Sequence, residues 1–255
     1  MMDQSISVIT VVKNGASCIE ACLDSVGAQT LEAEHLLIDG CSTDATLQIA
    51  KSKRLTNLRI VSEPDNGIYD AMNKGIRLAE GDIIGILNSD DVYADNRVLE
   101  RVKHALSNEA DQACYGDLLY VSNQNLDNVR RYWRSGKFST EKMRWGWMPP
   151  HPTFFVRRAV YDTYGLFNLS LGSAADYELM LRFLYKHCIP AQYIPEVLVK
   201  MRSGGVSNHS LRNRIKAHRM DYRAWEVNGL QPYPWTLLMK PLRKLPQFFH
   251  IPTSY

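Results

Sequence analysis

The amino-acid sequence predicts an α/β fold built around a mostly parallel sheet with helices on both faces. In the first half of the chain, short runs rich in β-branched residues alternate with amphipathic stretches, which is the rhythm of βαβ units. The strand candidates are apolar along their length, as expected for strands that are buried on both faces. With 255 residues, of which 45% are hydrophobic, the chain is long enough for one sizeable domain with a C-terminal extension.

The expected elements follow one another in a regular order only in the first half of the chain. There we expect strands at Ile6–Val12, Leu36–Asp39, Leu58–Val61 and Ile83–Leu87, separated by helices near 16–28, 43–53, 68–79 and 95–106. In the second half we expect strands at Ala113–Tyr120, Arg130–Trp133, Thr153–Val156 and Tyr193–Val199, and helices at Arg157–Tyr164, Asp176–His187 and Leu211–Val227. β-Branched and aromatic residues dominate the expected strands, whereas apolar residues recur at helical spacing in the expected helices.

The charge is distributed unevenly along the chain. From Lys200 to the end, ten Lys and Arg stand against two Asp and Glu, a net charge of +8, which leaves −5 on the first 199 residues. Residues 233–250 interleave apolar and basic side chains, as does a segment that lies in an anionic membrane interface. Packing of this tail on its own domain or on a second subunit is the alternative. Because the aromatic and basic spacing of a nucleic-acid-binding module is lacking, we expect no nucleic-acid partner.

The sequence gives no sign of export or of a disulfide framework. The first apolar run stops at Lys13 and is too short for a signal peptide or a membrane span. Five scattered cysteines without a CxxC pair support neither disulfides nor a zinc site. We therefore expect a cytoplasmic protein that can lie peripherally on the inner face of the plasma membrane.

Acidic residues follow several of the expected strands. Asp39 ends one strand, Asp65 comes shortly after the next, and Asp90 and Asp91 follow the strand that begins at Ile83. In an open α/β sheet, ligands bind beyond the carboxyl ends of the strands. Carboxylates gathered at one edge repel one another unless a cation offsets their charge, and Mg or Mn takes oxygen ligands and bridges carboxylates to substrate phosphates. Helix caps and turns are the alternative use for such residues.

The usual phosphate-binding loops are missing. The chain has neither a Gly-rich loop that ends in Gly-Lys-Ser/Thr nor a G-x-G-x-x-G after the first strand. The loop at Lys13 offers too little to hold a triphosphate, which disfavours a sugar-nucleotide pyrophosphorylase. A bound divalent metal is then the expected partner of a diphosphate.

Several motifs in order resemble those of the family two glycosyltransferases. The quoted segments are Ser7–Asn14, Ile38–Asp44, Glu63–Gly75 and Asn88–Asp91, and the resemblance spans roughly residues 6 to 207. It implies a GT-A (nucleotide-diphospho-sugar transferase) fold, with a Rossmann-like, mostly parallel central sheet and here a helical C-terminal extension. Within the family, the chain resembles bacterial enzymes that assemble exopolysaccharide, capsule or lipopolysaccharide repeat units.

The resemblance implies a role for each matching residue. Asp39 contacts the nucleobase, Asp65 lies in the same nucleotide pocket, Asp90 faces the ribose, and Asp91 binds the metal that bridges the donor diphosphate. Asn14, at the end of the first motif, joins the nucleotide-sugar-binding set. Asp176, in the motif Ser173–Leu179, is the catalytic base, and Ser207 belongs to a Gly-rich turn that closes over the donor. Inverting sugar transfer needs one such carboxylate to take the proton of the acceptor hydroxyl.

Three positions depart from the family pattern. Asn88 stands where many relatives have an acid, Gly40 replaces a frequent second aspartate, and Ala175 precedes Asp176 where an acid is common. The first two bear on donor identity. The third removes a hydrogen-bond partner of the base and leaves the base itself in place.

The acceptor side is expected near an aromatic run in the second half. Trp147 can stack on a sugar ring, and His151 can bond a hydroxyl or a phosphate; core packing is the alternative for Trp147. We expect a catalytic domain at 1–207, with a nucleotide-binding half (about 1–110) and an acceptor-binding half (111–207), and a basic helical extension at 208–255.

The sequence thus predicts an inverting, metal-dependent glycosyltransferase. Its donor is a UDP-sugar or, second, a GDP-sugar, and its acceptor is a lipid-linked saccharide of bacterial surface polysaccharide biosynthesis. A catalytically inactive subunit that binds a saccharide or a partner is the alternative. Homo-oligomerisation is left open.

Overall fold

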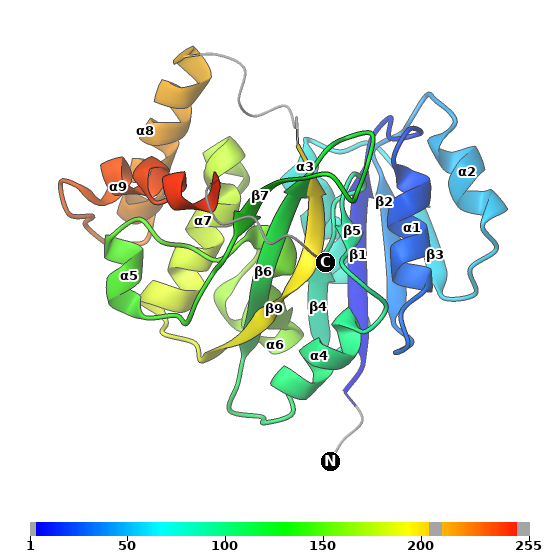
Figure 1. Ribbon diagram of the computed structural model, residues 1–255, viewed down its shortest axis with the longest axis horizontal. Helices are drawn as coiled ribbons and strands as arrows, with labels where there is room; N and C mark the ends of the chain where they lie inside the picture. Colours follow the sequence, from blue (N-terminus) through cyan, green and yellow to red (C-terminus); the bar gives the residue numbers. More distant parts are fainter. Residues whose placement is uncertain (1–3, 204–210, 249–255) are drawn as a thin grey trace.

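The chain folds around one sheet that is covered by helices on both faces (Figure 1). The computed structural model describes residues 4–203 and 211–248, and for residues 211–216 only the backbone. The strands are β1 (Ile6–Val12), β2 (Glu34–Asp39), β3 (Leu58–Ser62), β4 (Ile83–Ile86), β5 (Val92–Tyr93), β6 (Ala113–Val121), β7 (Val129–Trp133), β8 (Phe155–Arg157) and β9 (Ala191–Arg202). The helices are α1 (Ile19–Gly27), α2 (Thr46–Ser52), α3 (Ile68–Leu78), α4 (Val98–Ala105), α5 (Thr140–Arg144), α6 (Arg158–Tyr164), α7 (Ala175–Met180), α8 (Leu211–Val227) and α9 (Thr236–Leu242).

The sheet has the order β3-β2-β1-β4-β8-β6-β9-β5, and β7 pairs with β6. The first four strands are mutually parallel, and the long β6–β9 pairing is parallel as well. β5, β7 and β8 join in antiparallel fashion. Because β1, β2 and β4 run in one direction, their carboxyl ends meet at one edge, where the chain reverses its order at β1.

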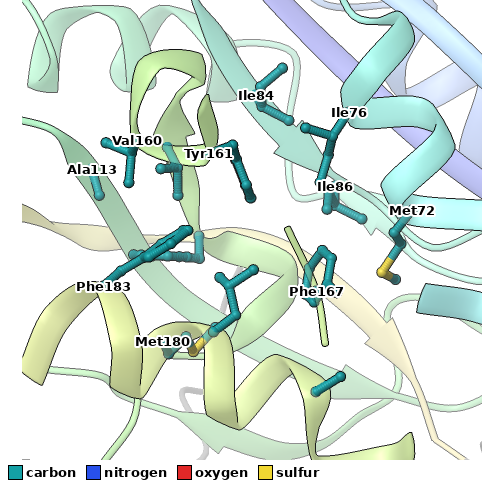
Figure 2. Close-up of a cluster of buried hydrophobic side chains, with 14 of the residues drawn as sticks. Met72, Ile76, Ile84, Ile86, Ala113, Val160, Tyr161, Phe167, Met180 and Phe183 are labelled. Atoms are coloured by element: carbon teal, nitrogen blue, oxygen red, sulfur yellow. The ribbon is translucent and has the colours of Figure 1, made fainter. Parts of the chain in front are cut away.

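Alternate residues of β1 pack into the hydrophobic cores on the two faces of the sheet. Ile9 and Val11 pack on one face with α3, α6 and α7, and this larger cluster is drawn in Figure 2. Ile6 and Val8 pack on the other face with α1 and α4. The period of two in a strand explains this division, and it also explains why the run reads as continuously apolar in the sequence.

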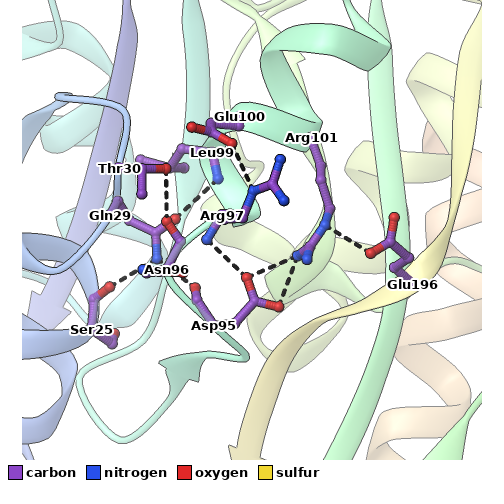
Figure 3. A network of polar contacts seen from close by, with 10 residues as sticks. All are labelled: Ser25, Gln29, Thr30, Asp95, Asn96, Arg97, Leu99, Glu100, Arg101 and Glu196. Carbon is purple, nitrogen blue, oxygen red and sulfur yellow. Dashed lines mark hydrogen bonds and ion pairs between the residues drawn. The ribbon is translucent and has the colours of Figure 1, made fainter.

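A polar network fixes α4 against the strands that lead to the site (Figure 3). Arg101 Nη1 lies 2.9 Å from Asp95, and Arg101 Nε lies 2.7 Å from Glu196 on β9. Gln29 donates to the Asp95 carbonyl over 2.7 Å, so the loop after β5 is tied to the end of α1. These contacts hold the loop region just beyond Asp91.

The helix that carries the expected catalytic base is anchored by a buried ion pair. Glu178 accepts from Arg182 Nε over 2.9 Å and from the Asn228 amide over 3.1 Å. Trp225, fully buried on α8, donates to the Tyr177 hydroxyl over 3.0 Å. α8 is therefore packed directly on α7, and beyond Met180 the helix widens into a π-helical segment, η3 (Leu181–Lys186).

The described part of the C-terminal tail packs on the domain. Thr236 and Leu237 are buried, and the Thr236 hydroxyl donates to the Arg144 carbonyl over 2.6 Å. Gly146 permits this docking: its φ is +75°, and a Cβ there would lie 2.5 Å from the backbone nitrogen of Lys240. The final short helix, η5 (Leu245–Phe248), lies against β7.

The fold class expected from the sequence is confirmed, with local differences. The strand expected at Thr153–Val156 is β8, shifted towards Arg157, because a 3-10 turn, η1 (His151–Thr153), precedes it. Pro152 has no N–H to donate to a neighbouring strand. The Thr153 N–H donates to the Pro150 carbonyl over 3.0 Å instead of to a strand. The division into halves and extension stays a prediction. None of the described helices combines the length and apolar character that a membrane crossing requires.

Candidate active site

The expected nucleotide carboxylates lie at the carboxyl ends of β2 and β3. Asp39 is fully buried, and its Oδ2 accepts from the Ser62 hydroxyl over 2.6 Å and from the Ser42 N–H over 3.1 Å. Asp65 is half-buried and accepts from the Gly67 N–H over 2.9 Å. Both carboxylates are thus held by the short loops that follow their strands.

Gly40 brings these two carboxylates together. A Cβ at Gly40 would lie 2.1 Å from Asp65 Oδ2, so that any side chain there would displace the Asp65 carboxylate. The departure from the family pattern noted at Gly40 therefore has a steric reason. In this chain Asp65 occupies the space that a second aspartate would need.

Asn14 joins the loops that follow β1 and β2. It adopts a positive φ of 55°, a conformation that asparagine tolerates better than most residues. Its Oδ1 accepts from the Thr43 N–H over 2.8 Å, and its own N–H donates to Ser42 Oγ over 2.8 Å. Asn14 shapes the nucleotide loops in this way, and direct contact with a nucleotide stays a prediction.

Asp91 is a buried carboxylate with an unsatisfied oxygen. It is 0% exposed, and Asn88 Nδ2 donates to its Oδ2 over 3.2 Å. Asp91 Oδ1 and Asn88 Oδ1 are both buried without a hydrogen-bond partner among the described residues. Burial raises the pKa of Asp91 well above its usual range, and the charge of Asp90 raises it further.

Two unsatisfied hard oxygens in one loop fit a divalent cation. Buried polar atoms without partners are rare in folded proteins, and carboxylate and amide oxygens are suitable ligands for Mg or Mn. Within the described residues no group of three or more His, Cys, Asp or Glu side chains is placed to hold a metal by itself. Asp91 and Asn88 are the residues that would hold such an ion.

Arg202 is a site residue that the motif comparison missed. Its charge and its backbone lower the pKa of Asp91, and its Nε is buried without a partner among the described residues. One guanidinium nitrogen donates to the Asn123 carbonyl. A cation immediately before the Gly-rich turn was the signal for it in the sequence.

Asp176 lies in the first turn of α7, half-buried, and receives the Tyr177 N–H on its Oδ1 over 2.7 Å. Burial raises the pKa of the Tyr69 hydroxyl, and the charge of Asp176 raises it further. The pKa of Tyr120 is raised by burial and also by the charges of Asp91 and Asp176. The same tyrosine thus lies within electrostatic reach of the expected metal carboxylate and of the expected base. Ala175, which stands where an acid is common before the base, is fully buried.

The two expected acceptor residues differ in their surroundings. Burial lowers the pKa of His151, and the charge of Asp176 opposes that change, so the ring lies near the base. Trp147 is 6% exposed, donates to the Ser135 carbonyl over 2.8 Å and packs on Tyr115. Trp147 is thus largely a core residue, although one side of it lines a cavity. Acceptor binding by either residue stays a prediction.

Asp90 and Ser207 are the remaining residues expected on the donor side. Asp90 is half-buried beside Asp91, and contact with a ribose stays a prediction. Ser207 lies outside the described residues.

Comparison with known proteins defines the class of this chain. The model of the family described as Glycosyl transferase family 2 matches residues 7–165, and the chain belongs to this family. It is 33% identical over 208 residues to a PGL/p-HBAD biosynthesis glycosyltransferase of Mycobacterium bovis (strain BCG / Pasteur 1173P2), which covers 79% of this chain and 78% of the relative.

Solved structures of glycosyltransferases share the GT-A fold seen here. Residues 1–349 of S. aureus TarS, solved in complex with UDP, superimpose with a TM-score of 0.65 at 19% identity. That match covers 86% of this chain and 65% of the TarS 1–349 chain, so the chain spans less than two thirds of that structure. Glucosyl-3-phosphoglycerate synthase from Mycobacterium tuberculosis, solved with Mn²⁺, UDP and phosphoglyceric acid, gives 0.62 at 16% identity, covering 91% of this chain and 81% of that one.

Proposed function

We propose that this chain is an inverting glycosyltransferase that uses a UDP-sugar, or alternatively a GDP-sugar, together with Mg or Mn. Its acceptor is a hydroxyl of a lipid-linked saccharide in the biosynthesis of a bacterial surface polysaccharide. The observation that carries the proposal is the pair of unsatisfied buried oxygens on Asp91 and Asn88. The charges of Asp91 and of Asp176 both raise the pKa of Tyr120. The complexes of TarS with UDP and of the mycobacterial synthase with Mn²⁺ and UDP support the choice of nucleotide and metal.

Asp91, with Asn88 beside it, would hold the ion. A bound divalent cation neutralises a diphosphate and stabilises it as a leaving group. Asp39 and Asp65 bind the nucleoside end of the donor, and Asp90 faces its ribose. The guanidinium of Arg202 supplies a further positive charge on the diphosphate side of Asp91.

Asp176 acts as the general base. Its carboxylate takes the proton of the acceptor hydroxyl while the hydroxyl oxygen bonds to the anomeric carbon. The bond from that carbon to the donor diphosphate breaks on the opposite face, which inverts the anomeric configuration. The nucleoside diphosphate carries away the electron pair of the broken bond.

The tail supports a membrane-borne acceptor. Its buried side packs on the domain, whereas its outer side exposes large apolar residues: Trp235, Leu238, Leu242, Leu245 and Phe248. Basic residues lie among them, which suits the interface of an anionic membrane.

Replacement of the base tests the catalytic part of the proposal. Asp176→Asn keeps the shape of the side chain and removes its basicity, so turnover of the UDP-sugar should fall by about 10²–10⁴-fold, while UDP binding persists. Release of UDP measures the turnover, and Asp162→Asn, at an exposed position of α6, is the matched control. Unchanged turnover in Asp176→Asn would rule out this residue as the base.

A further inference from the structure

A cavity of about 440 Å³ lies between β7, the Trp147 loop and the C-terminal tail. Trp133, Trp147 and Pro246 contribute apolar walls. The size is in the range of small-molecule sites, which are typically lined by apolar and aromatic groups with a few polar ones. The lining residues come from the end of β7, from Gly146–Met148, and from α9 and η5; in Figure 1, α9 lies on the side of the molecule away from α2.

The polar part of the cavity wall is cationic. Arg134, Lys240, Arg243 and Lys244 line it, and no carboxylate does so among the described residues. Lys240 has an acidic partner among the described residues, since its Nζ lies 2.8 Å from Asp221. The cavity therefore offers an excess of positive charge beside apolar walls.

Contacts of Arg131 hold together two of the elements that line the cavity, β7 and η5. Arg131 Nε donates to Gln247 Oε1 over 2.6 Å, which ties η5 to β7. The Arg131 guanidinium also lies 4.3 Å from the centroid of the Tyr120 ring and 5.3 Å from that of Phe248. Its Nη2 is buried without a hydrogen-bond partner among the described residues.

The cavity lies beside the helix that carries the expected base. Lys240 Nζ lies 3.6 Å from the centroid of the ring of Tyr177, the residue that follows Asp176. Burial and the charges of Lys240 and Arg131 lower the pKa of Lys244, and the charges of Asp221 and Asp176 oppose that change. A molecule that presents a hydroxyl to Asp176 can thus extend an acidic group into the cavity.

We infer that this cavity binds the acceptor through an anionic group carried on an apolar chain or ring, that is, through a phosphate of an anionic amphiphile. The inference rests on the proposed function and adds the chemical class of the acceptor. Phosphate oxygens pair with Arg and Lys through charge-assisted hydrogen bonds, while Trp133 and Trp147 cover the apolar portion. An anionic group would pair with these cations, whereas a neutral sugar would leave their charge to solvent.

Three probes separate the contribution of the anionic group to binding from that of the apolar chain. Farnesyl diphosphate, below its micelle-forming concentration, carries both features; inorganic pyrophosphate carries the anion only, and farnesol the apolar chain only. Binding is measured by calorimetric titration of the full chain. A chelator is present, so that no metal can bind the diphosphate at Asp91. We expect farnesyl diphosphate to bind at least about tenfold more tightly than either of the other probes.

Charge reversal at the cavity provides the matched variants. Lys244 is exposed, so Lys244→Glu should fold and should weaken farnesyl diphosphate binding at least about tenfold, with a smaller loss in Lys244→Ala. Lys51→Glu, at an exposed position of α2, changes the net charge equally and should leave binding intact. Equal binding by Lys244→Glu and wild type, or equal binding of pyrophosphate and farnesyl diphosphate, would overturn the inference.

A parallel titration of the wild type with UDP and Mn tests the proposed function separately from the assignment of the cavity. Binding of UDP without binding of farnesyl diphosphate would overturn the assignment of the cavity alone. Failure to bind UDP would contradict the proposed function on which the inference rests.

Discussion

The side chains of Asp91 and Asn88 form a desolvated polar pair in the candidate site. Asp91 is completely buried, and both residues carry an oxygen without a partner among the described residues. Burying an unpaired carboxylate is unfavourable by several kcal/mol unless a cation or donors compensate it. This local imbalance is the physical reason to expect a metal here.

Asn88 should act on the metal through Asp91. Its amide donates to Asp91 Oδ2 over 3.2 Å and so orients the carboxylate. Asn88→Ala should weaken Mn affinity roughly 10–100-fold, as loss of an outer-shell partner typically does. Mn titration followed by electron paramagnetic resonance measures this, with Asn88→Gln, which keeps an amide N–H donor, losing less affinity than Asn88→Ala. An Asn88→Ala variant that binds Mn as tightly as the wild type would contradict this role.

His35 should make the fold sensitive to acid. Burial lowers the pKa of His35 from 6.5 to about 4, so the unfolded chain binds the proton more readily between these values. The free energy of unfolding should therefore fall as pH drops from about 6.5 to about 4, by on the order of 3 kcal/mol. Urea unfolding at a series of pH values measures this decline in the free energy of unfolding. His35→Gln should show a shallower decline, and an identical pH dependence in the two proteins would disprove the assignment.

The sequence predicted which carboxylates belong to the candidate site, but not how the loops that carry them contact one another. Asp39, Asp65 and Asp91 were found because each follows an apolar run at a strand end. That Gly40 leaves room for Asp65, and that Asn14 bonds the neighbouring loop, depends on contacts between loops far apart in sequence. Arg202 was missed because its approach to Asp91 depends on the pairing of β5 with β9.

At the level of elements, α9 is docked through a glycine. Gly146→Ala would force a positive φ on a residue with a Cβ, which is unfavourable by about 1–2 kcal/mol, and would press that Cβ against the α9 backbone. The tail should detach, and limited proteolysis should cleave it faster.

A matched glycine separates strain from collision. Gly136 also has a positive φ, +69°, but a Cβ there would meet nothing within 4 Å. Gly136→Ala should therefore leave the tail protected. Equal protection of the tail in Gly146→Ala would show that this contact does not hold α9.

Periodicity predicted the regular elements well. β1 and α8 have the expected bounds, and β2, β3 and β4 begin or end within a few residues of them. β5 was missed because two residues give no periodic signal, and α9 was missed because Pro241 breaks the pattern while packing on Gly146 stabilises the turn. Antiparallel addition of β8 could not be read from a βαβ rhythm.

At the level of the whole molecule, the uneven charge separates an acidic catalytic body from a basic tail. The exposed apolar residues of the tail should insert into anionic vesicles. Leu238 and Leu245 are 61% and 55% exposed, so a Leu238→Glu, Leu245→Glu variant should fold and should lose most co-sedimentation with phosphatidylglycerol vesicles. Val227→Glu, at an exposed apolar position on α8, is the control. Undiminished sedimentation of the double variant would remove the membrane role of the tail.

The most direct test of metal-dependent donor binding is calorimetric titration with UDP, GDP and CMP, each with and without Mn, on the wild type and on Asp91→Ala. We predict that UDP binds the wild type in the presence of Mn and that binding is lost both without Mn and in Asp91→Ala. Binding of GDP in place of UDP would change the donor class and leave the site intact. Failure of every nucleotide to bind, or binding indifferent to both Mn and Asp91, would contradict the proposed donor site.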